Sequence, residues 1–185
     1  NDYAYAIQIL AGGVPRFALD IGGWQFAVAT QALSINKWYH LAGSYDGSNM
    51  KIYVNGVEEF TMPVTGSIDI SASTFKLGGW AGGEYFNGSI DEVKVWNVAR
   101  TKTEINSDLL ACSGGSESGL VAYYDFNDGN GSSIVRDKTS NNYDGNLVLM
   151  DPNTDWVSGV GVCGACTQEM TQLVEVIKYL PINAT

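Results

Sequence analysis

The sequence predicts an all-β protein, and three observations lead to this fold class. Of the 185 residues, 22 are glycine and only 4 are proline, while aromatic residues make up 11%. Apolar residues alternate with other residues over many short stretches, which is the period of a strand with one buried face. Asn-Gly pairs, typical of tight turns between strands, occur at residues 55–56, 87–88 and 130–131.

The alternating pattern places most of the strands in the first hundred residues. We expect strands at residues 3–9, 17–21, 24–28, 38–45, 50–54, 57–60, 75–79 and 89–96. Asn55-Gly56 separates two apolar runs and predicts a two-residue hairpin, because both turn residues must tolerate positive φ. Two later strands are expected at residues 121–126 and 147–148.

Two helices interrupt the strands. Thr101 and Glu104 have the spacing of a capping box, which predicts a helix that begins just after Thr101. Residues 167–180 carry an apolar stripe at helical spacing, and Pro181 ends it. We interpret this C-terminal helix as a docking or linker helix, with a partner-binding helix as the alternative.

Composition and charge exclude several classes of protein. Hydrophobic residues make up 45% of the chain, too many for a disordered protein. The formal charge of −10 argues against a nucleic-acid partner, because binding to phosphates needs a basic surface. No apolar run reaches the roughly 20 residues that a membrane-spanning helix needs, so no transmembrane segment is predicted.

Four segments, in order and spacing, resemble the concanavalin A-like, laminin G-like and pentraxin-like jelly-roll domains. They are Asn36–Gly47, Met50–Gly56, Leu77–Gly79 and Phe86–Asn97. The resemblance covers roughly residues 1–110. It implies a two-sheet antiparallel jelly-roll sandwich, to which the helical patterns add one short helix and the C-terminal helix.

A second piece, from residues 119–126 through 137–145, resembles the opening strands of the same family. Such a piece often follows a laminin G-like domain in large secreted bacterial surface proteins. We therefore expect three parts: a sandwich lacking its opening strands at residues 1–110, a connector with strands that resemble the opening segment at 111–157, and a connector with the amphipathic helix at 158–185.

The resemblance begins in the middle of a domain, so the strand at 89–96 is expected to need a partner. In this family the first and last strands are neighbours, and an unpaired strand edge exposes backbone donors and acceptors. Three explanations remain open: the chain is a fragment of a longer protein, the 121–126 strand folds back, or a neighbouring subunit or preceding domain completes the sandwich. The first two explanations are favoured over a strand donated by a neighbouring subunit, because the chain itself carries a suitable strand.

No catalytic activity is expected. Some enzymes with this fold cleave β-glucans with acidic residues spaced along one strand. The nearest pair here is Asp91 and Glu92, and adjacent residues of a strand point to opposite faces. His40 is the only histidine, and we interpret it as a packed or hydrogen-bonded residue.

A calcium site is one of two interpretations of an acidic loop. Asp91 is expected on the same strand face as Val93 and Val95, where a carboxylate is costly unless it is paired or bound to an ion. Domains of the resembled family often hold Ca²⁺ near the rim, with hard oxygen ligands. A nearby loop is expected to offer such ligands from Asp137, Asn141, Asn142 and Asp144. The alternative is a solvated cluster of turn residues without metal.

The three cysteines lie in connectors and predict a structural disulfide, which fits an extracellular protein. We expect a bridge from Cys112 to Cys163 or Cys166. A bridge between Cys163 and Cys166 is the alternative, and it leaves Cys112 for a partner.

A rim site is expected at Asp46, Asn49, Trp80 and Tyr85. Trp80 and Tyr85 flank a glycine-rich segment that we expect to be partly exposed, and aromatic faces stack on sugar rings. With the resemblance, this favours a non-catalytic adhesion or carbohydrate-binding module of a secreted or cell-surface protein, with a glycan or an extracellular protein as partner. The alternative is a structural subunit or spacer of a surface fibre that binds only neighbouring protein chains.

Overall fold

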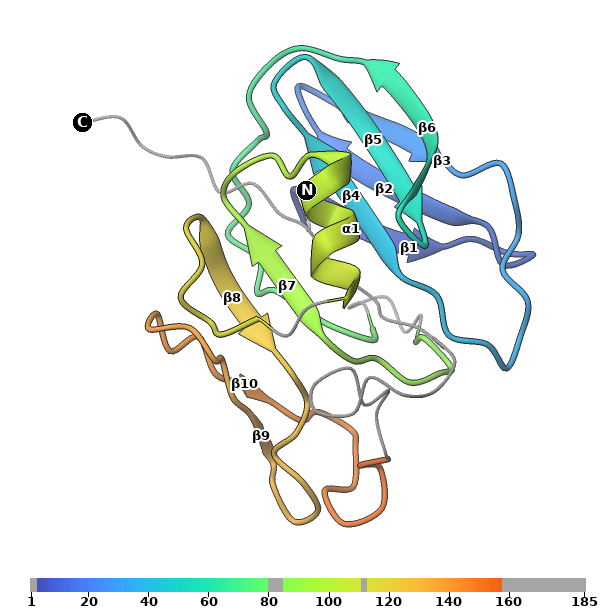
Figure 1. Ribbon diagram of the computed structural model, residues 1–185. Coiled ribbons are helices and arrows are strands. Elements are labelled where there is room, and N and C mark those ends of the chain that lie inside the picture. Colours follow the sequence, from blue (N-terminus) through green and yellow to red (C-terminus); the bar gives the residue numbers. More distant parts are fainter. Residues whose placement is uncertain (1–2, 80–84, 111–112, 158–185) are drawn as a thin grey trace.

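Two three-stranded antiparallel sheets form the larger part of the protein (Figure 1). The computed structural model describes residues 3–79, 85–110 and 113–157. The first sheet has the order β1-β2-β3, with β1 at Tyr5–Ile9, β2 at Pro15–Asp20 and β3 at Trp24–Val28. The second has the order β4-β5-β6, with β4 at Leu41–Tyr45, β5 at Asn49–Val54 and β6 at Val57–Pro63. The predicted jelly-roll sandwich is confirmed.

The main core lies between these two sheets. Phe17 and Leu19 of β2 pack in one buried cluster with Met50 and Ile52 of β5. Burial of each such side chain contributes about 1.5–3 kcal/mol. Gly43 on β4 lies directly against the Phe17 ring, at a position where any Cβ atom would overlap the ring. The sheets can therefore approach closely at this point.

The hairpin between β5 and β6 has the turn that Asn55-Gly56 predicts. Both residues have left-handed φ angles, 50° for Asn55 and 72° for Gly56. Gly56 also lies against the side chain of Asn106, on helix α1 (Lys102–Leu110). The helix therefore packs onto the tip of this hairpin.

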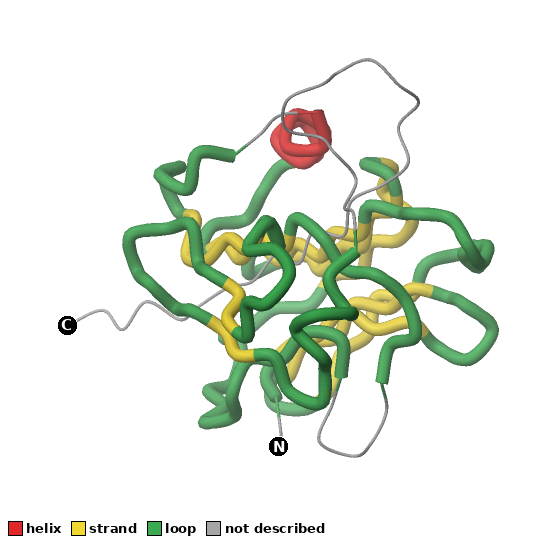
Figure 2. The backbone as a smooth tube through the Cα atoms, turned by 90° about the horizontal axis from the view of Figure 1, so that it is seen from below, coloured by secondary structure: helices red, strands yellow, loops and turns green. Residues whose placement is uncertain are grey.

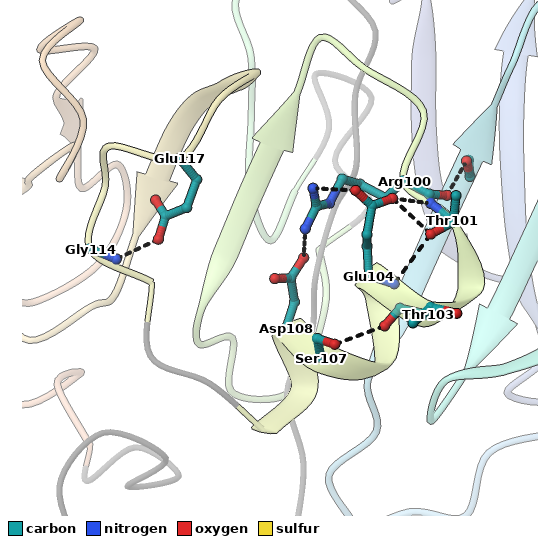
Figure 3. A network of polar contacts seen from close by, with 9 residues as sticks. Arg100, Thr101, Thr103, Glu104, Ser107, Asp108, Gly114 and Glu117 are labelled. Atoms are coloured by element: carbon teal, nitrogen blue, oxygen red, sulfur yellow. Dashed lines mark hydrogen bonds and ion pairs between the residues drawn. The ribbon is translucent and has the colours of Figure 1, made fainter.

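Helix α1 begins with the predicted capping box (Figure 3). The Thr101 amide donates to Glu104 Oε2 at 2.7 Å, and the Glu104 amide donates to Thr101 Oγ1 at 3.3 Å. Arg100 forms ion pairs with Glu104 and Asp108, and its guanidinium lies 4.0 Å over the Trp96 ring. These contacts tie the helix to the strand that precedes it. Figure 2 shows the helix nearly end-on, outside the layers of strands.

The remaining strands form two-stranded pairs. β7 (Val93–Trp96) pairs antiparallel with β8 (Leu120–Tyr124), with Val93 opposite Tyr124. The later segment therefore folds back onto the 89–96 region, which is the pairing that the fold-back explanation requires. β9 (Ile134–Val135) pairs with β10 (Gly145–Asn146).

Several expected strands differ from the structure. The strand expected at 38–45 begins only at Leu41, and the one at 89–96 begins only at Val93, because Glu92 has a left-handed φ of 53° that breaks an extended run. Residues 75–79 form no strand and contribute only an isolated bridge between Gly79 and Tyr85. The strand expected at 147–148 lies two residues earlier, as β10.

The helix expected at 167–180 lies outside the described residues. Across the part of the chain that the structure does describe, no helix is long and apolar enough to span a membrane.

Candidate functional site

The outer face of the β1-β2-β3 sheet carries a row of aromatic and polar side chains. Phe17 and Leu19 of β2 point into the core, so Arg16 and Ala18 point outward, because successive side chains of a strand alternate. In the strand register Arg16 lies opposite Gln8 of β1, and Ala18 lies opposite Phe26 of β3. We call the resulting group the outer-face row: Tyr3, Gln8, Arg16, Trp24 and Phe26.

The aromatic rings of the row contact one another in sequence. The ring centroids of Tyr3 and Trp24 are 4.5 Å apart, and those of Trp24 and Phe26 are 6.3 Å apart with the rings nearly parallel. Such spacings are typical of favourable aromatic pairs. Phe26 is 39% exposed, so part of this ring system is open to solvent.

The polar members of the row are fixed by hydrogen bonds. Arg16 donates from Nε and Nη2 to Gln8 Oε1, at 3.0 and 2.6 Å, and Gln8 Nε2 donates to the Tyr3 hydroxyl at 3.1 Å. The Arg16 guanidinium lies 4.4 Å over the Phe26 ring. A guanidinium has five N–H donors, and two of them are used here. The row therefore combines aromatic rings with positioned donors, two features that can bind a ring bearing hydroxyl groups.

The rim site expected from the sequence includes no member of the outer-face row. The sequence signal that could have indicated the row was the two-residue spacing of Trp24 and Phe26, which places both on one face of a strand. Which face points outward could not be read without the register to β2.

A cleft of about 940 Å³ runs beside the row, along β1. Its lining includes residues 3–11, 68–71, 73–79 and 85–87. Tyr85, a residue of the expected rim site, lines this cleft and is 65% exposed.

The structure does not bring the other rim-site residues to the cleft. Asp46 and Asn49 shape the turn between β4 and β5, where Asp46 Oδ1 accepts hydrogen bonds from the amides of Ser48 and Asn49 at 2.8 and 2.7 Å. Neither lines the cleft. Trp80 lies outside the described residues, so the rim site stays a prediction.

The carboxylate of Asp137 joins its loop to β8 by hydrogen bonds. Its Oδ1 accepts hydrogen bonds from the Tyr123 and Thr139 amides at 3.0 and 2.9 Å. Its Oδ2 accepts from the Thr139 hydroxyl at 2.8 Å and from the Tyr143 amide at 3.0 Å. These four donors account for the burial of Asp137 without an ion.

The other expected calcium ligands also form hydrogen bonds within the protein. Asp144 Oδ1 accepts from the Asp137 amide at 2.9 Å, and Asn141 Nδ2 donates to the Val121 carbonyl at 2.8 Å. Among residues 3–79, 85–110 and 113–157, no three His, Cys, Asp or Glu side chains gather where a metal could bind. Acidic side chains alone therefore do not form a Ca²⁺ site in the described residues. The expected site also includes Asn141, and it stays a prediction.

Asp91 does not lie where the sequence argument placed it. It precedes β7 rather than sharing a strand face with Val93 and Val95, and that premise was wrong because the left-handed Glu92 separates it from the strand. Its carboxylate is buried, and its Oδ1 accepts a hydrogen bond from the Glu92 amide at 2.9 Å.

A second buried polar cluster surrounds Glu92. Its Oε2 accepts a 2.8 Å hydrogen bond from the Tyr123 hydroxyl, and burial raises the pKa of the carboxyl above its ordinary value. The adjacent Lys94 is fully buried, with Nζ 5.4 Å from the Tyr123 ring centroid. Burial also raises the pKa of Tyr123, and the hydrogen bond to Glu92 adds to this rise. His40 is fully buried, as expected of a packed residue, and its amide donates to Asn55 Oδ1.

The expected disulfide cannot be placed, because Cys112, Cys163 and Cys166 all lie outside the described residues. The bridge stays a prediction.

The sequence profile of the concanavalin A-like lectin/glucanases superfamily, of laminin G type, matches residues 1–106. The chain belongs to this family, as the sequence resemblance predicted.

Two curated relatives are pappalysin-1 of mouse and of human, which are 37% and 36% identical to this chain over 78 residues. That match covers 40% of this chain but only 5% of either pappalysin. A solved structure from Bacteroides ovatus, described as a candidate carbohydrate-binding protein, is similar with a TM-score of 0.53 and 26% identity. The similarity covers 74% of this chain and 46% of that one.

Proposed function

We propose that this chain is a non-catalytic carbohydrate-binding module of a secreted or cell-surface protein. The observation that carries the proposal is the outer-face row, in which the Trp24 and Phe26 rings are stacked and the fixed guanidinium of Arg16 lies over the Phe26 ring. A sugar ring stacks on the aromatic rings of the row. Its hydroxyl groups accept hydrogen bonds from the N–H groups of Arg16 that do not bind Gln8.

Membership of a lectin-containing superfamily supports the proposal, and so does the similarity to the Bacteroides ovatus protein. The sandwich is rigid beneath the row, because β2 contributes both to the row and to the buried core. A preorganised surface loses little conformational freedom on binding, which favours affinity for a small ligand. Adhesion to a glycan-bearing surface is the role we propose for the whole protein.

A glycan array tests the proposal, with Phe26→Ala compared against the wild-type chain. Phe60 on β6 offers a matched control, because it is 40% exposed and does not belong to the row. We expect saturable binding to at least one glycan, weakened about ten-fold by Phe26→Ala, a loss of about 1.4 kcal/mol, and unchanged by Phe60→Ala. Binding to no glycan, with all variants folded by circular dichroism, contradicts the proposal and favours the structural subunit.

The rim site is a second candidate for the position of the sugar. The exposure of Tyr85 in the cleft favours it. If Trp80→Ala and Tyr85→Ala abolish binding while Phe26→Ala does not, the sugar binds at the rim and not on the outer-face row.

A further inference from the structure

Strand β1 lies at an edge of its sheet. The hydrogen bonds at its two ends show which of its residues direct their backbone groups to β2. The Asp20 amide donates to the Ala4 carbonyl at 2.8 Å, and the Leu10 amide donates to the Val14 carbonyl at 2.9 Å. In an antiparallel pair the backbone groups of alternate residues face the partner strand. Even-numbered residues of β1 therefore face β2, while Ile7 and Ile9 direct their N–H and C=O groups to the open edge.

No hydrogen bond from the described part of the chain reaches these outward groups of Ile7 and Ile9. An unpaired edge of this kind is a template for another strand. Five residues of β1 offer a pairing length of about 17 Å.

The cleft follows this same edge. Nine successive residues, 3–11, line it, so both faces of β1 border the space and the cleft lies along the edge of the strand. Apolar residues also line the cleft, among them Ile68, Leu77 and Ile90. Leu41 and Val93, the first residues of β4 and β7, also border it. A strand placed here would meet backbone partners on one side and apolar walls around its side chains.

The charge of the cleft is opposite to that of the protein. Among its described lining residues, Arg16, Lys37 and Lys76 are basic and only Asp69 is acidic, although the chain has 20 acidic and 10 basic residues. Lys37 and Lys76 are exposed. The rim therefore attracts a segment with acidic side chains.

We propose that the open edge of β1 is a strand-accepting site. Its occupant is an extended polypeptide segment from outside these 185 residues, with apolar side chains at alternate positions and acidic side chains between them. The segment adds to the sheet beside β1, its backbone pairs with Ile7 and Ile9, and its apolar side chains enter the cleft. Tyr3, Gln8 and Arg16 of the outer-face row also line the cleft, so the two sites adjoin. They use different groups, because the strand pairs with the backbone edge of β1 and the sugar stacks on the outer face of the sheet.

Amide hydrogen exchange measured by NMR tests the proposal directly. The probe is an eight-residue peptide of alternating valine and glutamate, and its counterparts carry lysine for glutamate or proline for the two central valines. In the free chain we expect fast exchange at Ile7 and Ile9 and slow exchange at Ala6 and Gln8. The valine–glutamate peptide should slow Ile7 and Ile9 at least ten-fold, the lysine peptide less, and the proline peptide not at all.

Matched variants separate the backbone and charge contributions. Ile7→Pro removes an outward N–H and should abolish peptide binding, whereas Ile7→Ala shortens the same side chain and retains the N–H. Lys37→Gln combined with Lys76→Gln should weaken binding several-fold, and Lys102→Gln on α1 should not. Peptide binding needs no glycan, so its result is independent of the array.

Three results would overturn the proposal. The first is unchanged exchange at Ile7 and Ile9 with every peptide. The second is slow exchange in the free chain at all concentrations, which would mean that a segment of the same chain occupies the edge. The third is protection that grows with protein concentration, which would mean that a second copy does so.

Discussion

The hydroxyl of Tyr123 on β8 donates a 2.8 Å hydrogen bond to Glu92 Oε2, and both side chains are buried. Glu92 immediately precedes β7, so this bond joins the two strands beyond their backbone ladder. Lys94 lies opposite Tyr123 in the register, and its Nζ has no hydrogen-bond partner among the described residues. The strand that folds back is therefore held by a buried polar cluster as well as by apolar packing.

We expect Tyr123→Phe to lower the free energy of unfolding by about 2 kcal/mol, because it leaves a buried carboxylate without its donor. Urea denaturation followed by circular dichroism measures the change. Tyr143→Phe is the control, because Tyr143 is largely exposed. Equal stability of the two variants would show that the bond to Glu92 contributes nothing.

The raised pKa of Glu92 predicts a dependence of stability on pH. Burial lifts this pKa above the ordinary value of 4.5, so the folded state holds the proton more tightly than the unfolded state. The contribution of Glu92 to stability therefore falls as pH rises above about 4.5. Relative to wild type, Glu92→Gln should gain stability as pH rises above about 4.5, as measured by urea denaturation at each pH.

Glu104 provides a control, because its pKa is shifted in the direction opposite to that of Glu92. Hydrogen bonds from the Thr101 amide and hydroxyl lower the pKa of Glu104, so its contribution is present above the ordinary pKa and is lost as pH falls. Glu104→Gln should therefore differ most from wild type near neutral pH and least in acid. Parallel pH profiles for the two variants would contradict both assignments.

Asp137→Ala should destabilise the protein by about 3 kcal/mol, because it leaves the buried amides of Tyr123 and Thr139 without an acceptor. The calcium proposal adds a separate expectation. The thermal midpoint of the wild-type chain should rise with Ca²⁺ and fall with EDTA, and Asp137→Ala should remove that difference. A midpoint unchanged by either treatment contradicts calcium binding. It does not affect the role of Asp137 as a hydrogen-bond acceptor for the Tyr123 and Thr139 amides.

Residues 1–110 expressed alone should fail to form a stable monomer. Without β8, the backbone edge of β7 and the buried side chains of Val93, Val95 and Trp96 lose their cover. Residues 1–157 should show a cooperative thermal transition, and the shorter piece should not. A cooperative transition for residues 1–110 would show that the returning strand is dispensable.

Local patterns were sufficient for the elements whose signal lies in a few neighbouring residues. The alternation at 24–28 predicted β3 with its bounds, Asn55-Gly56 predicted the hairpin, and Thr101 with Glu104 predicted the helix start. The start of β7 could not be predicted, because the left-handed turn at Glu92 accompanies a contact with Tyr123, 31 residues further along the chain. β9 and β10 have two residues each, too few to show a period.

The candidate site was harder to predict than the fold. The sequence shows that Trp24 and Phe26 share a face, but Arg16 and Gln8 join them only through the pairing of three strands. Asp46 has a local role that the sequence analysis did not name, because its carboxylate accepts amide hydrogen bonds from its own turn. Acidic turn residues often serve the backbone in this way. The place of Asp46 in the rim site stays a prediction.

The tryptophan indole N–H signals in an NMR titration with a glycan from the array test the carbohydrate-binding account most directly. The chain has five tryptophans, so five signals report on five places. The account predicts that the Trp24 indole signal shifts most, together with the backbone amide of Phe26. A titration in which Trp24 stays unchanged while Trp80 or Trp38 shifts would contradict binding at the outer-face row.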